Sequence, residues 1–199
     1  MDLKLPPAGL ALDSRAGLPE DLRVLVERYP RDGWTSHRNL GDMARFWLSR
    51  HAMFRELGTA LEEAQVSFLD DKMQAREFAG FFAPRLQFLL QQLHVHHHIE
   101  DDHYFPIFRR ADPRLVRGFD MLDCDHEALG TAIQSCVATA NRFLGSLDGS
   151  KDASKRAAEE YGRCGTVLLK GLTRHLDDEE DLIVPLILDR GEQELGVGH

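Results

Sequence analysis

The sequence predicts an all-α protein: an up-down-up-down four-helix bundle with a short extra helix on its N-terminal side. Three observations indicate this fold. Apolar residues recur at alternating steps of three and four along four long stretches, as they do in helices that pack into bundles. Short polar or glycine-bearing segments link these stretches. The strict apolar–polar alternation that is typical of β-strands occurs nowhere in the chain.

The bulk composition disfavours several classes of protein. With 199 residues, of which 43% are hydrophobic and 29% charged, the chain is long enough for one globular domain with a sizeable core. Its net charge of −9 disfavours binding to nucleic acid and to anionic membranes. No apolar run approaches the ~18 residues of a membrane-spanning helix.

The cysteines and the first residues indicate a cytoplasmic protein. Cys124, Cys136 and Cys164 are odd in number and form no CxxC pair, so neither a disulfide framework nor a thiolate zinc site is expected. This pattern fits a reducing compartment. Residues 1–7 lack the charged stretch and the apolar run of a signal peptide.

Residues 1–35 are expected to precede the bundle. The prolines and glycines of residues 1–18 predict an extended arm. A short helix then starts at Pro19 and ends before Pro30. The bundle is predicted to span residues 36–190, and residues 191–199 to form a frayed tail.

Four apolar seams define the long helices. Ser36 is a candidate N-cap for the first helix. Pro84 either kinks the second helix or marks its true start. The expected ranges are about 36–69, 73–110, 113–145 and 154–190.

Polar residues interrupt all four seams at positions that the periodicity assigns to the core. Two helices carry the same repeat, His-x3-Glu, whose two side chains share one helix face. An unpaired buried carboxylate costs several kcal/mol, so it must be protonated, paired or bound to a metal. The seam residues concerned are His51 on the first helix, His96, Glu100 and His103 on the second, His126 on the third, and His175 and Glu179 on the fourth.

The separations along the chain place these residues at a shared level. His51 precedes His96 by 45 residues, and His126 precedes His175 by 49. Each helix pair therefore repeats one unit, a single histidine followed by His-x3-Glu, and the expected site has pseudo-twofold symmetry. Imidazole and carboxylate ligands favour iron, manganese or zinc over calcium or magnesium, and the donor set suits a dinuclear iron or manganese centre.

The neighbours of these residues leave alternatives open. His103 lies seven residues after His96 and is either a metal ligand, a pocket residue or structural. His97 and His98 point about 100° and 200° away from His96, which predicts that they face a neighbouring helix or solvent, and His97 reaches the site only if the helix rotates. Asp101 and Glu180 either accept hydrogen bonds from ligand imidazoles of an adjacent helix or form a solvated acidic face.

Taken together, these residues resemble the hemerythrin-like family, also called the HHE cation-binding domain, over about residues 36–190. The resemblance implies a non-haem di-iron centre with an oxo or hydroxo bridge and an open coordination position, and it implies that Glu100 and Glu179 bridge the two irons. The implied ligands are His51, His96, Glu100, His126, His175 and Glu179. Oxygen-carrying hemerythrins place two histidines four residues apart on the third helix, but here the position four residues after His126 is Gly130. This departure argues against reversible oxygen carriage, and His103 is the candidate replacement.

Three functions compete. The first is a di-iron protein that binds or senses dioxygen, peroxide, nitric oxide or iron itself. The second is a di-iron oxidoreductase acting on peroxide or nitric oxide, for which Tyr104, His103 and His97 are the only candidate proton-transfer groups. The third is a structural zinc or iron module, in which the N-terminal arm docks a protein partner or a second copy in a homodimer. Whether the protein is an enzyme stays open.

Overall fold

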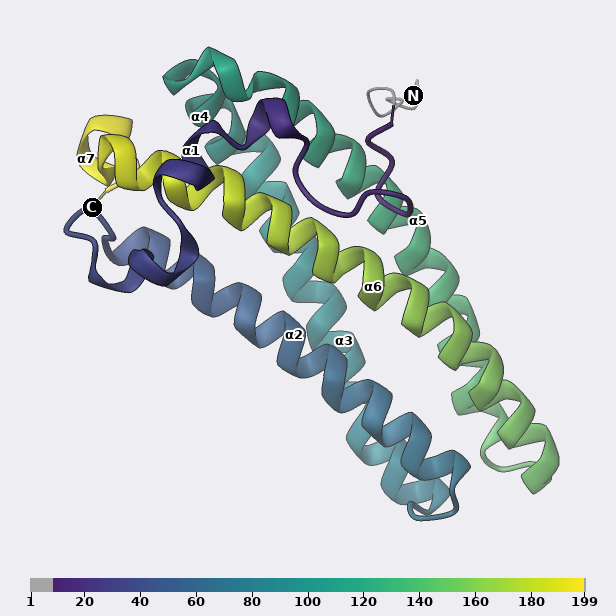
Figure 1. Cartoon of the computed structure of the whole chain (residues 1–199). Coiled ribbons are helices and arrows are strands. Elements are labelled where there is room, and N and C mark those ends of the chain that lie inside the picture. The colour runs from purple at the N-terminus through teal and green to yellow at the C-terminus, as the bar shows by residue number, and fades with distance from the viewer. Residues whose placement is uncertain (1–8, 199) are drawn as a thin grey trace. The chain divides into compact units, whose positions relative to one another are not determined.

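The computed structural model describes residues 9–198, and all of its regular elements are helical (Figure 1). No strand occurs within this described range, so the predicted all-α class is confirmed. The predicted N-terminal arm is described only from Gly9 onwards, because residues 1–8 lie outside the described residues, as does His199 at the end of the predicted tail.

The described residues form α-helices of different lengths, joined by 3-10 turns, a π-helical turn and short loops. The α-helices are α1 (Val24–Arg28), α2 (Asp42–Leu69), α3 (Ala75–Ile99), α4 (Phe105–Ala111), α5 (Val116–Ser146), α6 (Lys151–Arg190) and α7 (Glu192–Leu195). Three 3-10 turns cover Glu20–Leu22, Arg31–Ser36 and Pro113–Leu115. A π-helical turn, Glu100–Tyr104, joins α3 to α4.

The structure differs from the predicted elements at three places. Residues 192–195 of the predicted frayed tail form the helix α7, and Leu195 and Val197 are buried in the apolar core because they pack against unit 1. Ser36 does not cap a helix: its hydroxyl donates to the carbonyl of Gly33 and closes a 3-10 turn, and α2 begins six residues later at Asp42. The predicted second helix is divided by the π-helical turn, and Pro84 lies inside α3 rather than at its start. The up-down-up-down arrangement and the division at residues 35 and 190 stay predictions.

The described chain separates into two compact units. Unit 1 comprises residues 9–52, 96–127 and 173–198, and unit 2 comprises residues 53–95 and 128–172. The helices α2, α3, α5 and α6 each contribute residues to both units. We describe the two units separately.

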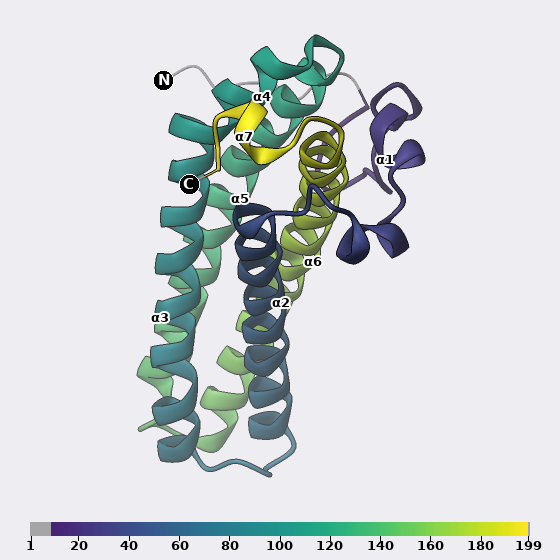
Figure 2. The same cartoon turned by 90° about the vertical axis from the view of Figure 1, so that its left-hand side faces the viewer.

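In unit 1, the segment before α2 packs into the same apolar core as the longer helices. Leu10, Leu22, Leu25 and Trp34 from that segment are buried together with residues of α4, α5, α6 and α7. Figures 1 and 2 show α1 alongside the C-terminal part of α6, and α7 beside α4. Gly118 of α5 lets Leu182 of α6 approach closely, since a Cβ at this position would lie 2.8 Å from a Leu182 methyl carbon.

Unit 2 has an aromatic core. The ring centroids of Phe78 lie 4.7 Å from those of both Phe82 and Phe143, and Tyr161 meets Phe82 edge-on at 4.9 Å. Gln65 is buried beside this core, and its amide donates to the carbonyl of Ala158. Aromatic packing of this kind stabilises a core through burial of large apolar surfaces.

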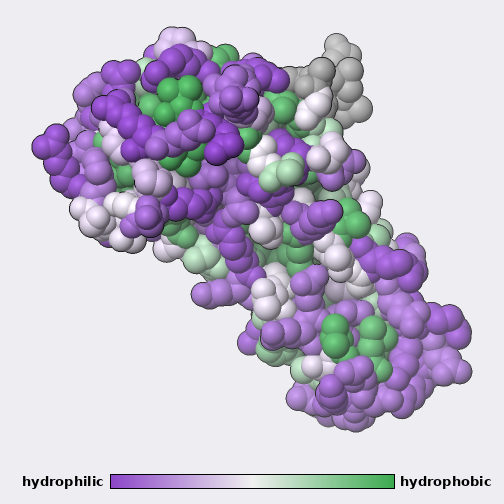
Figure 3. Space-filling model, viewed as in Figure 1, coloured by the Kyte–Doolittle hydropathy of each residue, from purple (hydrophilic) through white to green (hydrophobic). Residues whose placement is uncertain are grey.

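None of the helices in residues 9–198 combines the length and apolarity needed to cross a bilayer. The face shown in Figure 3 is predominantly hydrophilic, with small and separate apolar patches.

Candidate metal centre

Six of the predicted ligands come together in unit 1. They reach a common interior from α2, α3, the π-helical turn, α5 and α6, and five of them are buried while His96 is half-buried. Two groups of ligand atoms form there, each with all atoms within 4.8 Å of one another. Site A consists of His97, Glu100, His126 and His175, and site B consists of His51, His96, Glu100 and Glu179.

The distances within each site are those of groups that converge on one point. In site B, His51 Nε2 lies 3.0 Å from His96 Nε2, which in turn lies 2.8 Å from Glu100 Oε1. In site A, His126 Nε2 lies 3.2 Å from His175 Nε2 and 3.4 Å from Glu100 Oε2. The ring of His97 stacks on that of His126 with centroids 4.0 Å apart.

Both glutamates direct one oxygen at each site. Glu100 presents Oε1 to site B and Oε2 to site A. Glu179 presents Oε1 to His51 of site B at 3.5 Å and Oε2 to His175 of site A at 3.2 Å. A carboxylate placed in this way can bridge two cations that lie side by side.

Several of these atoms are buried without a hydrogen-bond partner. Among the described residues they include both carboxylate oxygens of Glu100, Oε2 of Glu179 and Nε2 of His97. Leaving such groups unsatisfied in the interior is costly, and more so for charged groups. Metal cations bound by imidazole nitrogens and carboxylate oxygens in both sites would satisfy these atoms, so the residues present fit a borderline metal such as iron, manganese or zinc.

A second layer of carboxylates orients the imidazoles from behind. His51 Nδ1 lies 3.0 Å from Glu180 Oε1, and His126 Nδ1 lies 2.8 Å from Asp101 Oδ1. Of the two alternatives left open for Asp101 and Glu180, the structure therefore shows the contact with an imidazole. Because an ionised carboxylate only accepts, each Nδ1–H donates, which leaves the Nε2 lone pair of a neutral ring for the site. Asp125, which the sequence analysis missed, lies 3.4 Å from His175 Nδ1 in the same relation.

The charged groups of the site shift one another's pKa values. Burial alone would lower the pKa of His51, but attraction to Glu179 and hydrogen bonds to Glu179 and Glu180 raise it to about 9. Burial likewise opposes protonation of His126, yet Asp101 and Glu100 raise its pKa to about 10. Burial and the neighbouring imidazoles hold the pKa of His97 well below its usual range.

The carboxylate of Glu179 responds in the opposite direction. Burial favours its neutral form, but His51 and His175 outweigh this and hold the pKa of Glu179 well below its usual range. Protons on the imidazoles therefore balance the buried carboxylates when no metal is bound. Metal cations would replace those protons, as metal binding to histidine and carboxylate ligands generally does.

The structure places the neighbouring histidines differently from the sequence analysis. His103 is exposed and lies outside both sites, whereas His97 is buried in site A. The π-helical turn between Glu100 and Tyr104 adds a residue to the turn and moves His103 out of the seam. If angles around the helix are measured from Glu100, His96 lies about 40° to one side and His97 about 60° to the other. This reference would have predicted that both histidines face the site.

Trp47 is a further residue whose role the sequence analysis missed. Its indole N–H donates to Glu179 Oε1 at 2.5 Å, and its ring lies 5.9 Å from His96 and 5.0 Å from Tyr104. The available signal was its position four residues before His51, one turn away on the same helix face.

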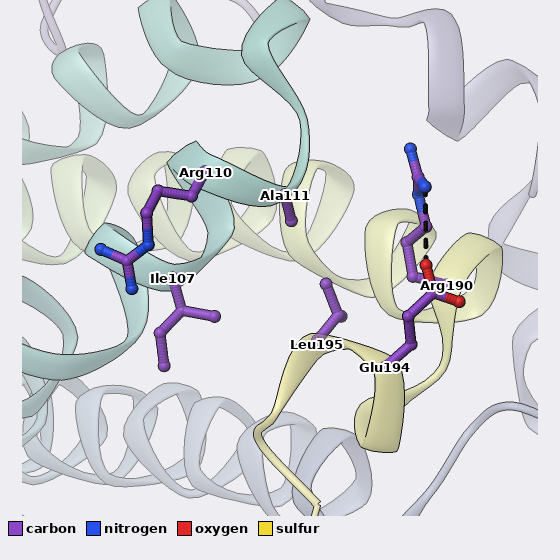
Figure 4. A pocket seen from close by; sticks show the side chains of 6 residues that line it. All are labelled: Ile107, Arg110, Ala111, Arg190, Glu194 and Leu195. Carbon is purple, nitrogen blue, oxygen red and sulfur yellow. Dashed lines mark ion pairs between the residues drawn. The ribbon is translucent and has the colours of Figure 1, made fainter.

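A surface cavity of about 310 Å³ lies elsewhere in unit 1 and holds none of these ligands. Figure 4 shows Arg110 and Arg190 on opposite sides of it, and Arg190 is paired with Glu194 and Asp189. Its lining residues are Ile107, Arg110, Ala111, Arg190, Glu194 and Leu195.

Comparison with known proteins agrees with this geometry. A family model described as the hemerythrin HHE cation binding domain matches residues 42–187. That range includes every residue of sites A and B and begins after the N-terminal segment of unit 1. No curated protein and no solved structure gives a match to the chain.

Proposed function

This chain belongs to the hemerythrin HHE cation-binding family, and on that premise we propose that it is a non-haem di-iron protein that binds or senses dioxygen, peroxide, nitric oxide or iron itself. The observation that carries the proposal is Glu100, whose two buried oxygens face two different sites and have no hydrogen-bond partner among the described residues. A single cation would leave one of these oxygens unsatisfied, whereas a pair would satisfy both.

The two sites would hold their cations unequally. His97, His126 and His175 offer three imidazole nitrogens in site A, while His51 and His96 offer two in site B. Glu100 and Glu179 would each give one oxygen to each site. Site B offers fewer protein ligands, so a cation held there would keep a coordination position for a small ligand. His97 would supply from α3 the imidazole that Gly130 cannot supply from α5.

The chain's own groups would shape the chemistry around the centre. Bound iron would supply redox activity and an open coordination position for a small diatomic or peroxide ligand. The carboxylates behind the histidines keep each Nε2 directed into the site, and Trp47 fixes the orientation of Glu179 through its indole N–H. Phe105, stacked on the ring of His126 at 5.5 Å, helps to exclude water from site A.

One observation favours the oxidoreductase as a second candidate. Tyr104 is half-buried and packs against Trp47, which contacts both His96 and Glu179 of site B. The Tyr104 phenol, one side chain away from site B, would then be the group that supplies a proton there. This candidate requires turnover, and the first requires only binding.

Metal analysis with absorption spectroscopy tests the proposal. Protein produced in iron-replete medium is expected to contain two irons per chain and to absorb in the near-ultraviolet through oxo-to-iron charge transfer. Addition of dioxygen, nitric oxide or peroxide to the reduced protein should change that spectrum. Stoichiometric zinc without iron would refute both candidates. Rapid turnover of peroxide or nitric oxide that is lost in Tyr104→Phe, with two irons retained, would favour the oxidoreductase.

A further inference from the structure

Arg15 reaches from the segment before α2 to a carboxylate behind site A. Its side chain is only 2% exposed. Its Nη1 and Nη2 atoms donate to the two oxygens of Asp125 at 3.1 and 2.5 Å, and its Nε donates to Asp178 at 2.7 Å. The carbonyl of Leu10 accepts a further bond from Nη1 at 2.7 Å, so the guanidinium is also fixed to its own segment.

The contact with Asp125 extends to a predicted metal ligand. Asp125 Oδ2, which accepts from Arg15 Nη2, also faces His175 Nδ1. A two-bond contact with a guanidinium fixes the plane of a carboxylate as well as its position. Asp178 does not depend on Arg15 in the same way, because Arg174 also holds it through two bonds. Asp125 is therefore the carboxylate whose orientation Arg15 determines.

Arg31 makes the equivalent connection to site B. Its Nη1 donates to Glu180 Oε2 at 2.7 Å, and the other oxygen of Glu180 faces His51 Nδ1 at 3.0 Å. Its Nε donates to Asp181 at 2.7 Å and its Nη2 to the carbonyl of Asp177 at 2.8 Å. Its guanidinium also lies over the ring of Trp34, 5.0 Å from the centroid.

We propose that residues 9–36 are part of the metal centre, with Arg15 and Arg31 as positioning residues that hold His175 of site A and His51 of site B through Asp125 and Glu180. This inference rests on the proposed function, since it assumes that these histidines bind metal. Both arginines precede residue 42, where the match to the family begins. The segment thus adds to the family's bundle a support for one imidazole of each site.

The two supports differ in strength. Arg15 is buried and fixes both oxygens of its carboxylate, whereas the side chain of Arg31 is 43% exposed and contacts one oxygen of Glu180. Water can replace part of the Arg31 contact, because a partly exposed ion pair is screened by solvent. Loss of Arg15 is therefore expected to disturb its site more than loss of Arg31.

Titration of the metal-free full-length protein with Co²⁺ under anaerobic conditions tests the proposal. A competing chelator gives the two dissociation constants, and the visible absorption of Co²⁺ reports the ligand geometry. His175→Ala and His51→Ala assign each binding step to a site. The variants are Arg15→Gln, Arg15→Lys and Arg31→Gln. The matched control is Arg28→Gln in the same segment, whose 67% exposed side chain pairs with Asp189 and contacts no carboxylate behind a ligand.

Arg15→Gln is expected to weaken the site A step by about 10- to 100-fold, the range found when groups behind metal ligands are removed. Arg31→Gln should weaken metal binding at site B by about 10-fold or less, because water can replace part of the contact of this half-exposed side chain. Each variant should alter the Co²⁺ spectrum of its own site only, Arg15→Lys should lie between wild type and Arg15→Gln, and Arg28→Gln should match wild type.

Thermal unfolding of the metal-free variants separates positioning from a purely structural role. If the arginines only stabilise the fold, the melting temperature falls while both Co²⁺ constants and both spectra stay at their wild-type values, and the inference is overturned. If Arg15→Gln fails to fold, Arg31→Gln and Arg15→Lys still test the proposal, because they change the same kind of contact less severely. Absence of Co²⁺ binding by the wild-type chain would overturn the proposed function together with this inference, whereas wild-type binding that the arginine variants leave unchanged overturns the inference alone.

Discussion

The two compact units draw on the same four helices, α2, α3, α5 and α6, and both have apolar cores, but they differ in the polar side chains that they bury. Unit 2 encloses stacked aromatic rings, and its buried polar residues among those described are uncharged: Gln65, Thr139 and Ser154. Unit 1 buries charged and titratable residues of the candidate metal centre and its surroundings. They are Arg15, His51, His97, Glu100, Asp125, His126, His175, Asp178, Glu179 and Glu180.

This difference shows that helical periodicity predicts which residues are buried, but not whether the buried residues form an apolar core or a binding site. Apolar burial is favourable without any partner, so unit 2 needs no ligand. Buried charges are favourable only when they are paired or bound to a metal, so unit 1 depends on what occupies its interior. Substitutions in the two units should therefore have separable effects, on metal binding in one and on unfolding in the other.

The largest effect is expected from Glu100→Ala in unit 1. Because its two oxygens face both sites, the substitution should weaken binding of both metals by at least about 100-fold, and metal content should fall from two per chain toward none. Metal analysis after dialysis against a weak chelator measures this. Retention of one or two metals would contradict the bridging role.

Phe82→Ala provides the opposite case in unit 2. Removal of this fully buried ring, stacked on Phe78 and edge-on to Tyr161, should lower the free energy of unfolding by about 3–5 kcal/mol. Metal stoichiometry should stay at two in the folded protein. Chemical denaturation together with metal analysis tests both expectations, and a loss of metal from the folded variant would show that the two units are not independent.

His97→Ala distinguishes the structural assignment of the site from the one made on sequence alone. The affinity for one of the two metals should fall by about 10- to 100-fold while the other metal stays bound, because His97 belongs to site A only. His103→Ala is the matched control and should leave both affinities unchanged, since His103 is exposed. The reverse outcome, with loss in His103→Ala alone, would restore the sequence-based ligand set.

The pH dependence of the metal-free protein provides a further comparison. His51 and His126 have a pKa of about 9 and about 10, above their value of about 6.5 in an unfolded chain, so the folded state binds more protons between these values. Their contribution to stability is fully present below about pH 6.5 and is lost as the pH rises through 9 and 10. The melting temperature of the metal-free protein should fall over this range.

The metal-loaded protein should behave in the opposite way. Its histidines are already deprotonated, so a rise in pH removes competition from protons and strengthens metal binding. Melting curves of both forms between pH 6.5 and 9 measure the difference. Unit 2 should not contribute in this window, because burial raises the pKa of Cys136 to about 11 and the thiol stays neutral. A parallel decline in both forms would argue against metal binding by His51 and His126.

Much of unit 1 was predictable because its ligands repeat at helical spacing. His96 with Glu100 and His175 with Glu179 follow the i, i+4 rule, and His51 and His126 interrupt otherwise apolar seams. The spacing rule failed where the backbone departs from the α-helix. The π-helical turn after Glu100 displaces His103, and no pattern in the sequence marked this turn.

The sequence by itself determined the helical class and six of the residues that meet in the two sites, since both follow from local periodicity that each helix satisfies independently of its neighbours. Only the tertiary structure decided which residues support them. Arg15 contacts Asp125 across 110 residues, Arg31 contacts Glu180 across 149, and Trp47 contacts Glu179 across 132. Contacts over such separations depend on how elements pack, and a periodic pattern within one element carries no record of them.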